Sequence, residues 1–286
     1  MGEHILGVIG GSGLYDLPGI RATESVHVDT PFGRPSDELV RGYLGDVAVV
    51  FLPRHGRGHR LLPTEVPYRA NVFALKQLGV QGLLSIGAVG SLRAHLPPGD
   101  VVIPDQFIDR TVGRPSTFFG DGIVAHVSLA DPVCAAFADS VEAAGRAAGG
   151  TVHRGGTYLC MEGPQFSSRA ESLLYRQWGA DVIGMTNWQE AKLAREAELC
   201  FASLALVTDY DCWKTDEAHV VIDDVLRILA ANADLARRAV VGVAERLAGQ
   251  RACACAEALR YAIITDRARI PEHRRTALAP LIGKYL

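Results

Sequence analysis

Residues 7–13 read Gly-Val-Ile-Gly-Gly-Ser-Gly, an apolar run that ends in glycine and serine. The same pattern returns in Val-Val-Phe-Leu-Pro-Arg-His-Gly (49–56) and in Leu-Leu-Ser-Ile-Gly-Ala-Val-Gly-Ser (83–91). Glycine turns expose backbone N–H groups to an oxyanion, and Arg54 adds a planar set of donors. In open α/β sheets, ligands bind beyond the carboxyl ends of the strands, so three such turns at one edge predict a phosphate site. One such turn alone is more often only a turn.

Two familiar phosphate motifs are excluded. Gly11 and Gly13 begin a G-x-G, but Asp16 stands where the dinucleotide fingerprint needs its third glycine. No Gly-Lys-Ser/Thr follows a glycine loop, so the chain is not a P-loop NTPase. We therefore expect phosphate to be held mainly by backbone and arginine.

The composition is that of a globular protein. The chain has 286 residues, of which 48% are hydrophobic and 21% charged, with a net charge of -3. That charge and the lack of Lys/Arg runs argue against a nucleic-acid partner. No stretch approaches the roughly 20 apolar residues of a membrane helix, and no secretory signal is evident. We expect a cytoplasmic protein.

The six cysteines show no paired spacing that would suggest zinc, so no metal site is predicted. Most are expected to be small buried side chains. Cys253-Ala-Cys255 is the exception, because it could form a redox-active pair.

Short apolar runs alternate with helical patterns, which predicts the α/β class. We expect strands at 5–10, 47–52, 82–87, 100–104, 156–160, 181–185 and 201–208. We expect helices at 67–78, 132–147 and 220–248, and two more that begin near 169 and 188. Asp131 is the expected N-cap of the second helix, and Ser168 and Asn187 each fit a capping box. Nothing marks a domain boundary, so we expect one domain, 1–286, with a helical tail at 250–286.

A second group of polar residues lies in the later part of the chain. Asp209 and Asp211 follow an apolar strand, and residues two apart on a strand face the same side, so both carboxylates can meet one ligand. The alternative is a pair of solvated loop acids. Thr186 lies at the predicted start of a helix, which favours anion binding, although Asn187 could act there as a cap only. Phe166 could stack on a flat ligand or belong to the core.

Seven stretches between about 5 and 230 form a larger pattern: Gly-Gly-Ser-Gly (10–13), Asp-Thr-Pro-Phe-Gly (29–33), Arg-His-Gly (54–56), Ala-Val-Gly-Ser-Leu-Arg (88–93), Asp-Gln-Phe-Ile-Asp-Arg (105–110), Glu-Gly-Pro-Gln-Phe-Ser-Ser-Arg-Ala-Glu (162–171) and Thr-Asp-Tyr-Asp-Cys-Trp (208–213). In these stretches the chain resembles the 5′-methylthioadenosine phosphorylase family, within the trimeric purine nucleoside phosphorylase group. The resemblance implies a single-domain twisted mixed β-sheet with a partly closed barrel, flanked by helices. It also implies phosphorolysis of the nucleoside to adenine and 5-methylthioribose 1-phosphate, with phosphate as co-substrate and no other cofactor.

The resemblance also assigns site residues. The residues that would hold phosphate are Gly10, Ser12, Arg54, His55, Ala88 and Thr186. Those that would contact the nucleoside are Phe166, Ser167, Met185, Asp209, Asp211, Ile222, Val225 and Leu226. His126 looks like the histidine that family members lend to a neighbouring subunit, so a homotrimer or homohexamer is implied.

Charge development on the reacting groups assigns Asp209 a catalytic role. Negative charge grows on the purine as the glycosidic bond stretches, so a protonated Asp209 at purine N7 would stabilise the transition state. A carboxylate also accepts from a 6-amino group but faces a 6-oxo group unfavourably, so the acid pair favours adenine. The alternatives are a phosphorylase for 6-oxopurine nucleosides or methylthioinosine, and a non-catalytic protein that binds nucleoside or senses phosphate.

The chain departs from the family pattern at a few positions. Gly87 stands where many relatives carry threonine, which removes a hydroxyl from the expected phosphate site. Ser12 replaces a threonine, and Trp188-Gln189 replaces an apolar residue followed by proline.

Overall fold

The computed structural model describes residues 4–11, 19–214, 222–247 and 253–286, with side chains described there except at 222–227, 229 and 231. The strands are β1 (Ile5–Gly10), β2 (Arg21–Val26), β3 (Leu39–Leu44), β4 (Val47–Pro53), β5 (Gly82–Ser91), β6 (Val101–Ile103), β7 (Gln106–Arg110), β8 (Val152–Arg154), β9 (Thr157–Met161), β10 (Val182–Gly184) and β11 (Cys200–Asp209). The α-helices are α1 (Tyr68–Gln77), α2 (Ala135–Ala147), α3 (Arg169–Gln177), α4 (Asn187–Glu196), α5 (Ile222–Arg246), α6 (Glu272–Ala277) and α7 (Ala279–Ile282). Three short 3-10 turns lie at Cys255–Glu257, Arg267–Arg269 and Gly283–Tyr285.

The strands form one mixed, branched sheet. Its main path runs β2-β3-β4-β1-β5-β10-β9-β7, and β5 also pairs with β11, which leads through β6 to β8. Strands β4, β1, β5 and β11 are parallel neighbours, whereas β3 and β10 run antiparallel to their partners β4 and β5. The mixed sheet flanked by helices is confirmed, and its strands follow an open path that does not close into a ring among the described residues.

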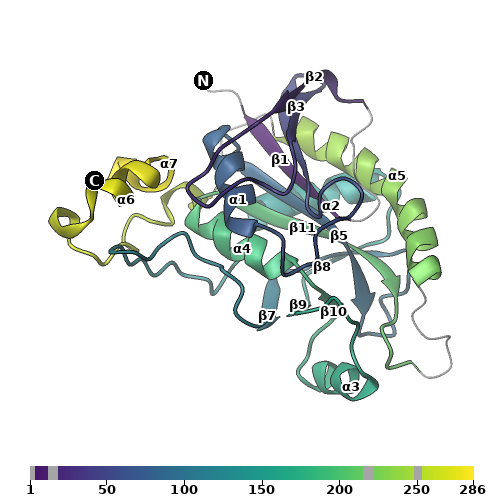
Figure 1. The fold of residues 1–286 in the computed structure, drawn as a ribbon. Coiled ribbons are helices and arrows are strands. Elements are labelled where there is room, and N and C mark those ends of the chain that lie inside the picture. Colours follow the sequence, from purple (N-terminus) through teal and green to yellow (C-terminus); the bar gives the residue numbers. More distant parts are fainter. Residues whose placement is uncertain (1–3, 12–18, 215–221, 248–252) are drawn as a thin grey trace.

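Helices cover both faces of the sheet (Figure 1). Helices α2 and α5 pack against each other and against β11, while α1 and α4 pack together on the opposite side. Strands β1 and β4 are buried along their whole length, as expected for parallel strands covered on two faces. No helix within the described ranges combines the length and the apolar character that crossing a bilayer requires.

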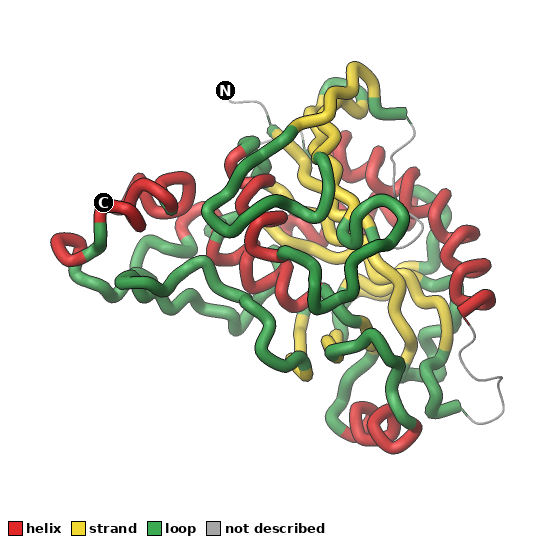
Figure 2. Tube along the Cα trace, viewed as in Figure 1, coloured by secondary structure: helices red, strands yellow, loops and turns green. Residues whose placement is uncertain are grey.

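The C-terminal segment 253–286 contains short helices and no extended strand (Figure 2). It lies against the loop before α2, where Ala125 bridges Ile263 and the N–H of His126 donates to the carbonyl of Ala262. Its side chains Leu259, Leu278 and Ile282 are buried in the main core.

All seven expected strands are present, and β2, β3, β7 and β8 are additional. Strand β2 (Arg-Ala-Thr-Glu-Ser-Val) is exposed at one end of the sheet, so it has no apolar alternation to detect. The capping box at Ser168 is confirmed. The caps expected at Asp131 and Asn187 are wrong: Cys134 precedes α2, and Thr186 precedes α4.

Candidate active site

The three glycine-containing segments meet at one edge of the sheet, but only the first two leave their strands there as expected. The third is not a turn, because Gly87 and Ala88 lie inside β5, which continues to Ser91. Gly10 at the end of β1 lies opposite Pro53 of β4 on one side and Ile86 of β5 on the other. The N–H of Arg54 donates to the carbonyl of Gly10 at 2.8 Å, and that of Gly11 donates to Ile86 at 2.9 Å. A cavity of about 300 Å³ opens at this edge.

Most of the predicted site residues line this one cavity. They are Arg54, His55, Ala88, Phe166, Met185, Thr186, Asp209 and Asp211. Gly10 and Ser167 are not among the lining residues, although their neighbours Gly11 and Phe166 are. His126 is exposed and does not line the cavity of its own chain. Ser12 and the side chains of Ile222, Val225 and Leu226 lie outside the described residues.

Arg54 is buried at the end of the cavity that the sequence analysis assigns to phosphate, and several partners hold it. Its Nε and Nη2 donate to the two carboxylate oxygens of Glu190 at 2.5 and 3.0 Å. Nη2 also donates to Ser85 Oγ at 2.8 Å, and Nη1 donates to the carbonyl of Ile86 at 3.1 Å. Nη1 carries a second N–H, which the guanidinium can offer to an anion. A Cβ at Gly11 would lie 2.7 Å from this nitrogen, so glycine is needed there.

His55 lies beside Arg54 as a neutral imidazole. Burial, and then the charge of Arg54, lower the pKa of His55 to about 4. Its Nδ1 lies 2.8 Å from the carbonyl of Leu61, so Nδ1 carries the proton and Nε2 remains an acceptor. A neutral Nε2 can accept a hydrogen bond from a protonated phosphate oxygen.

Thr186 brings a free hydroxyl to the start of α4. It is the N-cap residue, yet its side chain makes no capping hydrogen bond, and it is buried in the cavity wall. The hydroxyl and the helix N-terminus together favour an anion.

Two acids occupy the other end of the cavity, next to a bulge in β11. The register of β11 on β5 shifts between Val207 and Asp209, and Asp209 pairs with Gly90. A Cβ at Gly90 would lie 3.0 Å from Asp209 Oδ1 and 3.4 Å from Asp211 Cβ, so this glycine makes room for both acids. Asp211 lies beyond the strand with a φ of 53°, so strand alternation is not what directs it into the cavity.

Burial raises the pKa of both acids, and the charge of Asp209 raises that of Asp211 further. The Thr208 hydroxyl lies 2.7 Å from Asp209 Oδ2 and 3.2 Å from the carbonyl of Val89. One hydroxyl proton can serve only one of these acceptors, so a protonated Asp209 donating to Thr208 satisfies both contacts. Asp211 Oδ2 is buried with no hydrogen-bond partner in the described part of the chain, and a ligand donor would satisfy it.

An apolar wall lies between the two polar ends. It includes Met161, Ile183, Met185 and Ala205, and the exposed ring of Phe166 lies at the rim. Phe166 is therefore not a core residue and can stack on a flat ligand. Arg114 holds the two loops of this wall together, because its guanidinium donates to the carbonyls of Met185 and Glu162.

Several residues that sequence reasoning did not find support the site. Glu190 is 1% exposed and accepts from Arg54 and from the Ser85 hydroxyl. Asn187 Nδ2 donates to Ser85 Oγ at 2.8 Å and to Ser203 Oγ at 3.0 Å, which explains why Asn187 is not a helix cap. His59 and Arg60 also line the cavity, and the rings of His55 and His59 stack 4.3 Å apart. The Arg-His pair at 54–55 indicates a basic end of the site from the sequence alone. No local pattern, in contrast, predicts that Glu190 pairs with Arg54.

The chain is similar to known proteins along nearly its whole length. Residues 5–245 match the family model of the phosphorylase superfamily. S-methyl-5′-thioadenosine phosphorylase of Geobacter sulfurreducens is 56% identical over 285 residues, which are 99% of this chain and 100% of that protein.

Two solved structures extend the similarity to the fold. A methylthioadenosine phosphorylase from an antarctic soil metagenomic library has a TM-score of 0.93 and 50% identity, and the match covers 98% of this chain and 99% of that one. The Schistosoma mansoni methylthioadenosine phosphorylase in complex with adenine has a TM-score of 0.85 and 39% identity, covering 90% and 96%. The chain therefore belongs to the phosphorylase superfamily, within its methylthioadenosine phosphorylase family.

Proposed function

We propose that this chain is a pentosyltransferase that converts 5′-methylthioadenosine and inorganic phosphate into adenine and 5-methylthioribose 1-phosphate, a step of purine and methionine salvage. One observation carries the proposal: Arg54 and Thr186 at one end, and Asp209 and Asp211 at the other, line a single cavity of about 300 Å³. Cavities of this size suit one small ligand. The names of the relatives agree with this chemistry.

The polar ends have complementary roles in the reaction. Phosphate held by Arg54, His55, Ala88 and Thr186, together with Gly10 and Ser12, attacks C1′ of the nucleoside. The bond from C1′ to the purine nitrogen breaks, and its electron pair goes to the base. Asp209 gives a proton to purine N7 as that charge develops, which lowers the barrier because the leaving group departs neutral.

The base pocket accounts for the choice of adenine. Phe166 would stack on the purine, and Asp211 Oδ2, which is buried and unpartnered, would accept from the 6-amino group. A 6-oxo group would leave that oxygen facing another acceptor. Met185 would contact the ribose, and Ile222, Val225 and Leu226 would surround the methylthio group. Neither a metal nor an organic cofactor takes part in this scheme.

The proposal includes a homotrimer or homohexamer in the cytoplasm. The exposed position of His126, away from its own cavity, suits a residue given to a neighbouring subunit. The six free thiols suit a reducing compartment. Mixing His126→Ala with Asp209→Asn should restore part of the activity if sites are shared, and no restoration would contradict the sharing.

A phosphate-dependent assay tests the proposed reaction. Base release would be compared for methylthioadenosine, adenosine, inosine and methylthioinosine, each with and without phosphate. We expect methylthioadenosine to have the highest kcat/KM. Turnover confined to the 6-oxopurine nucleosides would favour the alternative phosphorylase, and binding without turnover would favour a nucleoside-binding protein.

A further inference from the structure

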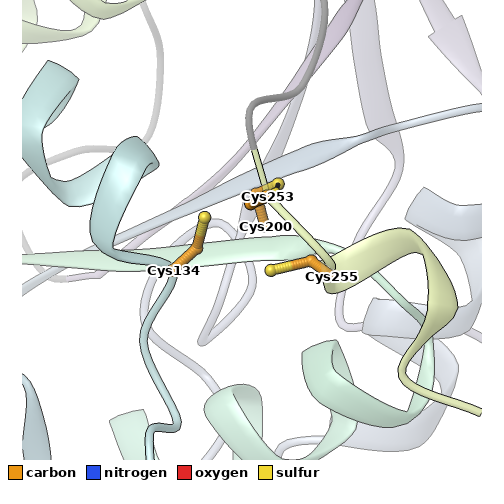
Figure 3. Close-up of side chains that lie close together, drawn as sticks. All are labelled: Cys134, Cys200, Cys253 and Cys255. Carbon is orange, nitrogen blue, oxygen red and sulfur yellow. Dashed lines mark hydrogen bonds between the residues drawn. The ribbon is translucent and has the colours of Figure 1, made fainter.

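Four cysteines gather outside the nucleoside cavity (Figure 3). They are Cys134, Cys200, Cys253 and Cys255, and their Sγ atoms all lie within 4.8 Å of one another. Three separate segments supply them: Cys134 precedes α2, Cys200 begins β11, and the other two belong to the C-terminal segment. Figure 3 shows the four side chains close together, with those of Cys200 and Cys253 overlapping in this view.

The spacing of the sulfur atoms fits one tetrahedral metal. Zinc binds thiolates at about 2.3 Å, which places the sulfurs of a tetrahedral site about 3.8 Å apart. The Sγ atoms of Cys200 and Cys253 are 3.3 Å apart, and no two Sγ atoms of the group are more than 4.8 Å apart. The sulfur–sulfur distance of a tetrahedral zinc site falls within this range. Two disulfides would instead bring the sulfurs into pairs about 2.05 Å apart.

The surroundings suit a closed and negatively charged centre. Cys134, Cys200 and Cys255 are buried, and Cys253 is half-buried. Cys134 is the N-cap residue of the 13-residue helix α2, where the helix dipole favours a thiolate. The guanidinium Nη1 of Arg195 lies 4.0 Å from Cys255 Sγ and offsets negative charge on the sulfurs.

We propose that these four cysteines form a structural zinc site. Each thiol that binds the ion loses its proton to solvent, and the four thiolates leave no open position for a substrate or water. The site would fasten the C-terminal segment to α2 and β11. That segment also contacts the loop that carries His126, so the metal would stabilise the fold at a distance from the reacting atoms.

Metal analysis of the full chain tests the proposal. The protein would be produced with added zinc, purified under reducing conditions without chelators, and measured by elemental mass spectrometry. We expect about one zinc per chain in the wild type, and a loss of at least about tenfold in Cys253→Ser/Cys255→Ser. Cys212→Ser is the matched control, because Cys212 lies outside the cluster, and it should keep its zinc.

A cobalt spectrum of the wild type gives a second readout that does not depend on the variants folding. Co²⁺ in place of zinc should give the strong visible absorption of tetrahedral thiolate coordination. A wild type with less than about a tenth of a zinc per chain and no such absorption would overturn the proposal. An intact mass lowered by the hydrogens of one or two disulfides, with the cluster thiols unreactive, would overturn it in favour of disulfides.

Discussion

Replacement of Asp209 by asparagine tests whether the reaction needs a transferable proton at this position. The asparagine side chain would keep an oxygen to accept from the N–H of Asp211, a contact of 2.7 Å in the present structure. Its amide could donate to the Thr208 hydroxyl, which would then donate to the carbonyl of Val89. The local structure is thereby preserved, and only the transferable proton is lost.

General acid catalysis contributes about 10²–10⁴-fold, or roughly 3–5 kcal/mol of barrier. We therefore expect Asp209→Asn to lower kcat for methylthioadenosine at least about 100-fold, while KM for phosphate stays within about threefold. Asp139→Asn is the matched control: its carboxyl is 72% exposed on α2, away from the cavity, and its kcat should not change.

The pH profile gives a second readout. Burial raises the pKa of Asp209, and the acid works while protonated, so wild-type kcat/KM should fall as pH rises through that pKa. The variant should lose this alkaline limb. A kcat within about threefold of wild type, or an unchanged alkaline limb, would remove Asp209 from the acid role.

Three further changes probe the phosphate end of the cavity. Glu190→Gln should lower the free energy of unfolding by about 3–5 kcal/mol in denaturant titrations, because it leaves the buried Arg54 without its counter-charge. The matched control Glu24→Gln, whose carboxylate is 62% exposed beside Arg41, should cost less than about 1 kcal/mol. Gly87→Thr should lower KM for phosphate about tenfold, because the added hydroxyl can bind the anion. The new Cβ would lie 3.4 Å from Arg54 Nη1, which is an ordinary contact distance. A raised KM would contradict this expectation. The pKa of His55 is about 4 in the folded protein and 6.5 in the unfolded chain. Its contribution to the free energy of unfolding is therefore complete above pH 6.5 and should fall by about 3 kcal/mol towards pH 4. His55→Asn should remove this part of the pH dependence.

Local patterns were enough to predict part of the end of the cavity that we assign to phosphate. Strands β1 and β4 end at their glycine-containing turns, and parallel neighbours deliver such turns to one edge, so the meeting of residues 10 and 54 could be expected. Residue 87 joins them from inside β5, which continues to Ser91. The acids also meet in the cavity, but strand alternation explains only Asp209. The bulge at Val207–Asp209 and the left-handed backbone of Asp211 are tertiary features that no short pattern encodes.

Long-range partners could not be predicted in the same way. Glu190 lies 136 residues from Arg54 in the chain, and its buried carboxylate looked like an ordinary helix residue. The cysteine cluster escaped detection because its members come from three distant segments rather than from a paired motif. The exposed strand β2 lacks the apolar alternation on which strand prediction depends.

The most direct test of the account is a ³¹P NMR time course of wild-type protein with methylthioadenosine and inorganic phosphate. In the proposed reaction, phosphate is the nucleophile at C1′ and is held in the same cavity as the proton donor. A sugar 1-phosphate resonance should grow one-for-one with released adenine, and no adenine should form without phosphate. Adenine released while the phosphate resonance stays unchanged would show hydrolysis by water and would contradict the account.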